Sequence, residues 1–125
     1  MDRSEAETLR IVNTRTGHQL ADRAWLAQSH ASRMKGLLNI KELEAGRGLF
    51  IPRCGAIHTF FMKMKIDVVF VDGTLHVMSL FPAAAPFRMF WGGWKARGVI
   101  ELPPGTIQRT GTQRGDLLAC HPESS

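Results

Sequence analysis

The sequence is poor in cysteine and has no long apolar run. Its 125 residues include only two cysteines, Cys54 and Cys120. These are too few for a disulfide framework and supply at most half of a four-ligand zinc site. No apolar run approaches the roughly 20 residues that a membrane-spanning helix needs. The first ten residues, MDRSEAETLR, carry acids in place of the basic and apolar segments of a signal peptide. We therefore expect a cytoplasmic protein with reduced thiols and no membrane span.

Acidic residues are absent from a long part of the chain. None occurs from Gly73 to Ile100, where the bases are Arg88, Lys95 and Arg97. The formal net charge is +5, and residues 32–65 alone hold seven bases against two acids, an excess of five. Such a bias attracts phosphates, nucleic acid or other anions. A solvated basic surface that aids solubility is the simpler interpretation.

Length and composition predict one domain over residues 9–120, flanked by loose tails at 1–8 and 121–125. We expect one helix over His30–Leu38, with Ser29 as its N-cap. Short apolar runs separated by Gly and Pro predict a mainly β (α+β) domain. Its sheet is expected to curl into a barrel-like form, because closure removes exposed edges. The expected strands are Leu9–Asn13, Gln19–Ala27, Gly48–Ile51, Ile57–Met64, Ile66–Val71, Thr74–Phe81, Arg97–Leu102 and Asp116–Cys120.

The Asp-Gly pair at 72–73 predicts a two-residue hairpin turn, since glycine tolerates the positive φ of a type I′ turn. Such a turn would pair Val69 with His76. Asp67 and His76 would then be diagonal neighbours on one face of the sheet, on the order of 7–8 Å apart. The inference depends on the register, because a slip of one residue would move the two side chains to opposite faces.

The stretch from Cys54 to Asp72, CGAIHTFFMKMKIDVVFVD, places a thiol, an imidazole and a carboxylate in a strongly apolar run. Cys54 and His58 have a C-x3-H spacing, but a structural zinc needs a second converging pair. Cys120 and His121 do not supply it, because adjacent strand residues point to opposite faces. We therefore expect no metal site.

The carboxylate of Asp67 needs a partner if the strand IDVVFV is buried, because an unpaired buried carboxylate costs several kcal/mol. It either accepts hydrogen bonds that fix the start of the strand or belongs to a site. Together with His58 or His76 it would form an acid/base pair. Cys54 is a weaker candidate nucleophile, because no thiol-enzyme signature surrounds it.

The segment FRMFWGGW, residues 87–94, has more aromatic residues than a loop needs for packing, and its Gly-Gly pair interrupts any regular element. Aromatic rings interleaved with Arg88, Lys95 and Arg97 suit stacking on bases or sugars beside an anionic group. The structural alternative is a hydrophobic lid over one end of the sheet.

Five short elements occur in a characteristic order along the chain. They are RMKGLL (33–38), GLFI (48–51), the stretch 54–72, VIELPPG (99–105) and RGDLL (114–118). Together they resemble the DUF192 family of small bacterial and archaeal proteins, over roughly Leu9 to Leu118. The sequence departs from the family pattern at Lys65, where a proline is common, and at Leu38, where a methionine is usual.

The resemblance implies a compact, β-rich, barrel-like domain with a short helix, and it implies no established activity. It also marks positions that a shared site would use, although packing and turns would account for them equally. The matched positions are Arg33, Gly36, His58, Met62, Lys63, Asp67, Glu101, Gly115 and Asp116.

Our first hypothesis is a non-enzymatic binding or accessory domain with a basic, aromatic-lined groove and no cofactor. The strands of His58–Asp67 would form the groove and residues 87–94 would roof it. Its ligand would be small and anionic or sugar-like. The candidate ligand-binding residues are Arg33, His58, Lys63, Asp67, Arg88, Trp91, Trp94 and Glu101.

Two alternatives belong to other functional classes. One is a small hydrolase or transferase that uses Asp67 with His58 or His76. The other is nucleic-acid binding through the basic region 32–65, with an affinity that falls steeply as salt increases.

Overall fold

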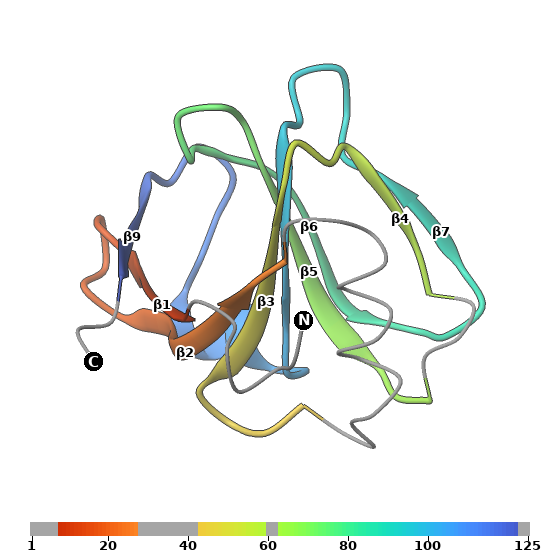
Figure 1. Ribbon diagram of the computed structural model, residues 1–125, viewed down its shortest axis with the longest axis horizontal. Helices are drawn as coiled ribbons and strands as arrows, with labels where there is room; N and C mark the ends of the chain where they lie inside the picture. The colour runs from red at the N-terminus through yellow and green to blue at the C-terminus, as the bar shows by residue number, and fades with distance from the viewer. Residues whose placement is uncertain (1–7, 28–42, 60–62, 123–125) are drawn as a thin grey trace.

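The structure is a computed structural model that describes residues 8–27, 43–59 and 63–122, and these contain nine strands and one short helix (Figure 1). The helix predicted over His30–Leu38 lies outside the described residues. No helix in the described ranges has the length and apolarity required to cross a membrane. The elements are β1 (Thr8–Asn13), β2 (Gln19–Leu26), β3 (Arg47–Pro52), β4 (Ala56–His58), β5 (Ile66–Val71), β6 (Val77–Ala84), β7 (Met89–Trp91), β8 (Gly98–Leu102), α2 (Thr106–Thr110) and β9 (Leu118–Pro122).

Seven of the strands form one curled sheet in the order β6-β5-β8-β3-β2-β1-β9, while β4 and β7 form a separate two-stranded sheet. All pairings are antiparallel except that of β2 with β3. The two edges of the large sheet meet at one end. There the Leu118 N–H donates to the Leu75 carbonyl at 3.0 Å and the Val77 N–H donates to the Asp116 carbonyl at 2.8 Å. The mainly β, barrel-like fold expected from the sequence is confirmed.

The centre of the large sheet is buried on both faces. Every residue of β5 and of β8 is buried. Ile66, Val68 and Phe70 pack into one core cluster, and Val69 and Val71 pack into another on the opposite face. Burial of each such side chain contributes about 1.5–3 kcal/mol. A strand covered on both faces reads as a continuous apolar run, which explains why β5 matches its predicted bounds.

The two-residue turn predicted at the start of β6 is wrong. Val71 pairs with Val77, so a five-residue loop joins β5 to β6. One carboxylate oxygen of Asp72 accepts hydrogen bonds from the backbone N–H groups of Thr74 and His76, both at 2.9 Å. These local side-chain bonds organise the longer loop, and β6 consequently begins three residues later than predicted.

The segment 87–94, predicted as a loop, contains strand β7. Its partner β4 is three residues long and overlaps the start of the predicted strand Ile57–Met64, of which residues 60–62 lie outside the described residues. Next to these strands, the Thr59 N–H donates to the Arg88 carbonyl at 2.8 Å and the Phe87 N–H donates to the Thr59 carbonyl at 2.9 Å. This pairing places part of the aromatic segment in regular structure at one side of the molecule (Figure 1).

The C-terminal part of the fold also differs from prediction. The last strand is Leu118–Pro122, two residues later than predicted, so two residues assigned to a loose tail pair with β1. The cause is Asp116, whose carboxylate accepts the Gln113 N–H at 2.8 Å and so forms a turn where a strand was expected. Helix α2 was not predicted, because its N-cap is Gly105. Glycine lacks the side-chain oxygen by which Ser, Thr, Asp or Asn caps a helix and marks its start in a sequence.

Candidate functional site

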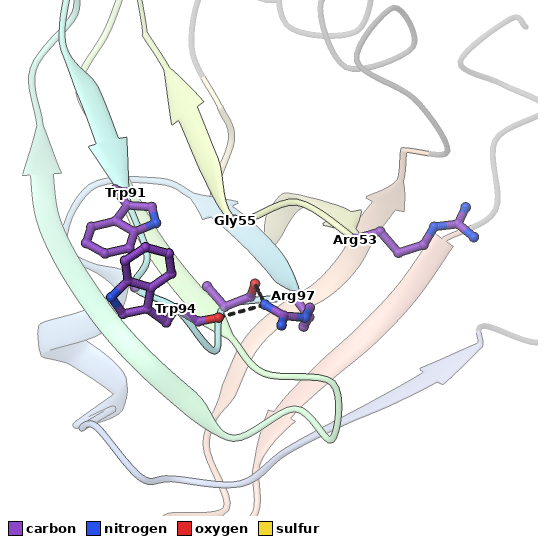
Figure 2. Close-up of a pocket in the computed structure, with 7 residues that line it drawn as sticks. Arg53, Gly55, Trp91, Trp94 and Arg97 are labelled. Atoms are coloured by element: carbon purple, nitrogen blue, oxygen red, sulfur yellow. Dashed lines mark hydrogen bonds between the residues drawn. The ribbon is translucent and has the colours of Figure 1, made fainter.

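A shallow surface pocket of about 470 Å³ lies where the turn after β3 meets the loop after β7 (Figure 2). Its principal side chains are Arg53, Trp91, Trp94 and Arg97, and Gly55 forms part of its wall. We call it the Trp-Arg pocket. It combines aromatic rings with cations in a small area.

The two tryptophans of the pocket are largely exposed. Trp91 is 56% exposed and Trp94 is 85% exposed. Their ring centroids are 5.1 Å apart and their planes are at 88°, which is an edge-to-face contact (Figure 2). Burying these rings in a core or against a ligand would be favourable, so their exposure leaves a binding surface open.

The backbone around the pocket is tightly connected. The Gly92 N–H donates to the Gly55 carbonyl at 2.8 Å, and the Arg53 N–H donates to the Arg97 carbonyl at 2.7 Å. Gly92 lies directly over Phe70, and a Cβ at this position would overlap the phenyl ring. A glycine is therefore needed at this close approach, and the loop that carries the tryptophans is held on the core.

The two arginines of the pocket are held differently. The Arg97 guanidinium donates to the carbonyls of Trp94 at 2.9 Å and Ala96 at 2.8 Å, so its position is set by its own loop (Figure 2). Arg53 is exposed and has a φ of 55°, in the left-handed region that a non-glycine residue seldom adopts. Its side chain is directed away from the two tryptophans (Figure 2), so Arg53 contributes to the rim of the pocket, and Arg97 provides the guanidinium beside the rings.

A second hollow of about 510 Å³ lies beside α2, between β2 and the Pro103-Pro104 turn. Asp22 and Arg109, which both line it, provide opposite charges, and neither Trp91 nor Trp94 contributes to it. The charged side chains that line the Trp-Arg pocket are all basic, and they lie with exposed aromatic rings. It is therefore the stronger candidate for an anionic ligand.

The structure brings together only part of the predicted site. Trp91 and Trp94 line the Trp-Arg pocket, whereas Lys63 and Arg88 are exposed and do not line it. Arg33 lies outside the described residues. The Trp-Arg pocket lies at the end of β3, whereas the groove was expected between the His58–Asp67 strands, of which residues 60–62 lie outside the described residues.

Asp67 is fully buried and bonded to backbone groups. One of its carboxylate oxygens accepts the Ala83 N–H at 2.8 Å, and the other accepts the Ile107 N–H at 2.8 Å. Ala83 has a φ of 50° and lies at the irregular end of β6. Ile107 lies in the first turn of α2, whose N-cap residue provides no side-chain bond. Asp67 thus acts as a remote helix cap and connects β5 to β6 and α2.

The expected acid/base partners of Asp67 do not lie beside it. In the observed register His76 precedes Val77, which pairs with Val71. Four residues of strand separate Val71 from Asp67, which is about 13 Å. His58 lies in β4, in the two-stranded sheet.

Glu101 is fully buried in β8, where its cross-strand neighbours are Leu49 and Val68. Cross-strand pairs share a face, and successive residues alternate. Glu101 therefore lies on the Val68 face and Asp67 on the opposite one, so the two carboxylates do not converge. No group of three His, Cys, Asp or Glu side chains suitable for a metal ion occurs within the described ranges.

A buried polar cluster joins β1 to the turn before β9. Asp116 accepts hydrogen bonds from Asn13 Nδ2 at 2.8 Å and from Arg15 Nε at 2.6 Å, and Arg15 also donates to the Gly111 carbonyl at 2.7 Å. The Arg15 hydrogen bond is the main cause that holds the pKa of the Asp116 carboxyl well below its ordinary value of 3.8. This cluster fastens the sheet where its edges meet.

Sequence reasoning did not place Arg53 at the site, and it named Arg97 only as a neighbouring base. Arg53 lies at the rim of the pocket because β3 pairs with β8, with Pro52 opposite Gly98. The run of aromatic residues gave a signal for Trp91 and Trp94. The turn that carries Arg53 gave no comparable signal, because in the sequence it is only the tetrapeptide Pro-Arg-Cys-Gly.

The chain is similar to several known proteins. The DUF192 family model, described as Uncharacterized ACR, matches residues 11–120. A UPF0127 protein of Thermococcus kodakarensis is 30% identical, over 90% of this chain and 73% of its own length. A UPF0127 protein of Thermococcus gammatolerans is 31% identical, over 87% and 73%. A crystal structure from Novosphingobium aromaticivorans, described as a protein of unknown function, has a TM-score of 0.74 and 24% identity over 90% of this chain and 83% of that chain.

Proposed function

The chain belongs to the DUF192 family, and we propose that it is a non-catalytic binding domain for a small, sugar-like or planar ligand that carries an anionic group. The ligand occupies the Trp-Arg pocket. One observation carries the proposal: two exposed indoles and the Arg97 guanidinium, which the Trp94 carbonyl holds in place, lie around a single hollow (Figure 2).

The chemistry of the pocket suits two parts of one ligand. Exposed indole faces accept a flat or ring-shaped group, since such stacking depends on surface and not on a particular hydrogen-bond pattern. A guanidinium binds phosphate or carboxylate through a planar fork of donors. Arg97 is already oriented by the Trp94 carbonyl, so it loses less freedom on binding than a mobile side chain would.

The positions of the carboxylates support a binding role over an acid/base role. Both oxygens of Asp67 accept backbone hydrogen bonds, and Glu101 lies on the other face of the sheet. Neither lines the Trp-Arg pocket. The pocket therefore supplies recognition groups without a carboxylate that could transfer a proton.

The test is a thermal-shift and tryptophan-fluorescence titration with sugar phosphates, the corresponding free sugars, inorganic phosphate and a short oligonucleotide. A sugar phosphate at about 100 times its Kd should stabilise the fold by about 2.7 kcal/mol. Arg97→Ala should weaken that binding roughly tenfold, because a hydrogen bond to a charged group contributes about 1.5–3 kcal/mol.

Arg88→Ala is the matched control, because Arg88 is an exposed base of the same acid-free segment and does not line the pocket. It should bind the sugar phosphate as the wild type does. Equal losses in the two variants would reduce the effect to net charge and contradict the pocket. Stabilisation by the oligonucleotide alone, falling steeply with salt, would instead indicate nucleic-acid binding.

A further inference from the structure

We infer that the outer face of β7 is a docking surface for an anionic lipid bilayer, a role that goes beyond binding a small ligand. The surface consists of Met89 and Trp91 in β7, Phe87 just before the strand and Trp94 in the loop that follows it. We call these four residues the apolar row.

The apolar row is unusual in its exposure. Phe87 is 68% exposed and Met89 is 76% exposed, and the two tryptophans of the Trp-Arg pocket complete the row. In the part of the chain that the structure describes, five large hydrophobic residues are exposed, and four of them lie in this row. Residues at alternate positions of a strand share one face, so Met89 and Trp91 lie on the same face of β7, and the exposed Phe87 lies two residues before Met89.

The backbone holds the row in place. Phe87 has a φ of 62°, a left-handed conformation that is strained for an aromatic residue. Its N–H donates to the Thr59 carbonyl at 2.9 Å, and the Thr59 hydroxyl accepts the Arg88 N–H at 2.9 Å. Phe90, on the alternate face, packs against Phe81 with ring centroids 5.0 Å apart. The inner face of β7 is thus anchored in the core, and its outer face remains in solvent.

Charge identifies the occupant. Arg88 and Lys95 are exposed within the row's own segment, Arg53 and Arg97 are exposed beside it, and no acid occurs from residue 73 to residue 100. Aromatic side chains with basic neighbours are typical of membrane-interface surfaces. An anionic bilayer attracts each nearby Lys or Arg. A second copy of this chain would bring the same cations together, which disfavours self-association through the row.

The experiment uses vesicles of phosphatidylcholine alone or with about 30% phosphatidylglycerol, an anionic lipid. Co-sedimentation and tryptophan emission are measured at low and at physiological salt. We expect the anionic vesicles to bind the protein and shift its emission to the blue, with weaker binding at higher salt. Phe87→Ser combined with Met89→Ser should reduce binding at least about tenfold, because vesicle affinity scales with buried apolar area.

Leu117→Ser is the matched control, because Leu117 is the fifth exposed large hydrophobic residue of the described part of the chain, at 41%, and directly precedes β9. Strands β9 and β7 lie on opposite sides of the molecule (Figure 1). It should bind vesicles as the wild type does. The double variant changes only exposed side chains outside the Trp-Arg pocket, so it should still bind the sugar phosphate. Loss of vesicle binding with retained sugar-phosphate binding distinguishes the two proposals. Circular dichroism melting checks that each variant folds.

Any of four results would overturn the inference. The first is no binding to anionic vesicles, and the second is equal binding to neutral ones. The third is vesicle binding that the double variant retains. Capture of an acidic peptide in preference to vesicles would also count against it, since the same charges would then recognise a protein.

Discussion

Two sides of this molecule differ in which groups they bury: one buries polar side chains, and the other exposes apolar ones. Where the sheet edges meet, Asn13 and Asp116 are buried and joined to each other, and Arg15 closes the cluster. On the β4–β7 side, large apolar side chains and cations are exposed. We call the first region the closed edge. The closed edge stabilises the fold. The β4–β7 side exposes groups that could still form favourable contacts with a partner, and such surfaces generally serve recognition.

The same contrast separates acids from bases. Asp67 and Asp116, two of the positions marked by the family resemblance, hold backbone segments together. Arg53, Trp91 and Trp94 hold nothing comparable and face solvent. We therefore expect substitutions of the acids to change stability and substitutions at the pocket to change binding.

The largest effect is expected at Asp67. Asp67→Ala leaves the buried N–H groups of Ala83 and Ile107 without an acceptor and should lower the free energy of unfolding by about 4 kcal/mol. Urea denaturation measures it, and Trp94→Ala is the control, with an expected change within about 0.5 kcal/mol because the ring is exposed. A stable Asp67→Ala protein that no longer binds its ligand would break the contrast and assign Asp67 to the site.

A smaller, pH-dependent effect is expected at the closed edge. Arg15 and the other donors hold the pKa of Asp116 below its ordinary value of 3.8. The folded state therefore favours the carboxylate, which stabilises the protein above the unfolded pKa and loses that contribution as pH falls through the folded one. Asp116→Asn should cost about 2.5 kcal/mol at neutral pH, and the difference from wild type should shrink below about pH 4.

Urea unfolding at neutral pH and at several acidic values tests this dependence. Arg15 is about half exposed, with 49% of its side chain accessible, so salt should reduce only part of the effect. A difference between Asp116→Asn and wild type that stays constant with pH would assign the loss to packing alone.

The smallest effect tests how the two regions are connected. Gly92→Ala should cost about 2 kcal/mol, because the new Cβ overlaps Phe70 and the loop must shift. Ligand affinity should fall as well, since Gly92 bonds to the pocket wall at Gly55. Gly93→Ala adds a Cβ in open space at a φ of 102°, so it should cost only about 1 kcal/mol of backbone strain. Equal losses of stability and affinity in the two variants would contradict a specific role for the Gly92–Phe70 contact.

Sequence patterns predicted the centre of the fold better than its connections. β5 was predicted to the residue, because a continuous β-branched run identifies a strand buried on both faces. The loop before β6 was mispredicted, because its length depends on hydrogen bonds that the Asp72 carboxylate accepts from the backbone of Thr74 and His76. Such local polar bonds compete with the ladder and leave no hydrophobic pattern.

The site shows the same limit. Trp91 and Trp94 were identified because clustered aromatic residues are visible in one segment. Asp67 was expected to need partners, but the partners are backbone groups 16 and 40 residues away, which only the tertiary structure specifies. Arg53 was missed for a similar reason, since the pairing of β3 with β8 brings it to the rim of the pocket.

The pairing of β9 with β1 has a consequence for biosynthesis. Leu118 is the partner of Asn13, so β1, the first described strand, cannot complete its pairing until β9 has been synthesised. A chain emerging from the ribosome builds β1 to β8 with one sheet edge unpaired, and such an edge invites association with other chains until it is covered. Residues 118–122 therefore cover the edge of β1 late in synthesis, and until then that edge must be kept from pairing with other chains.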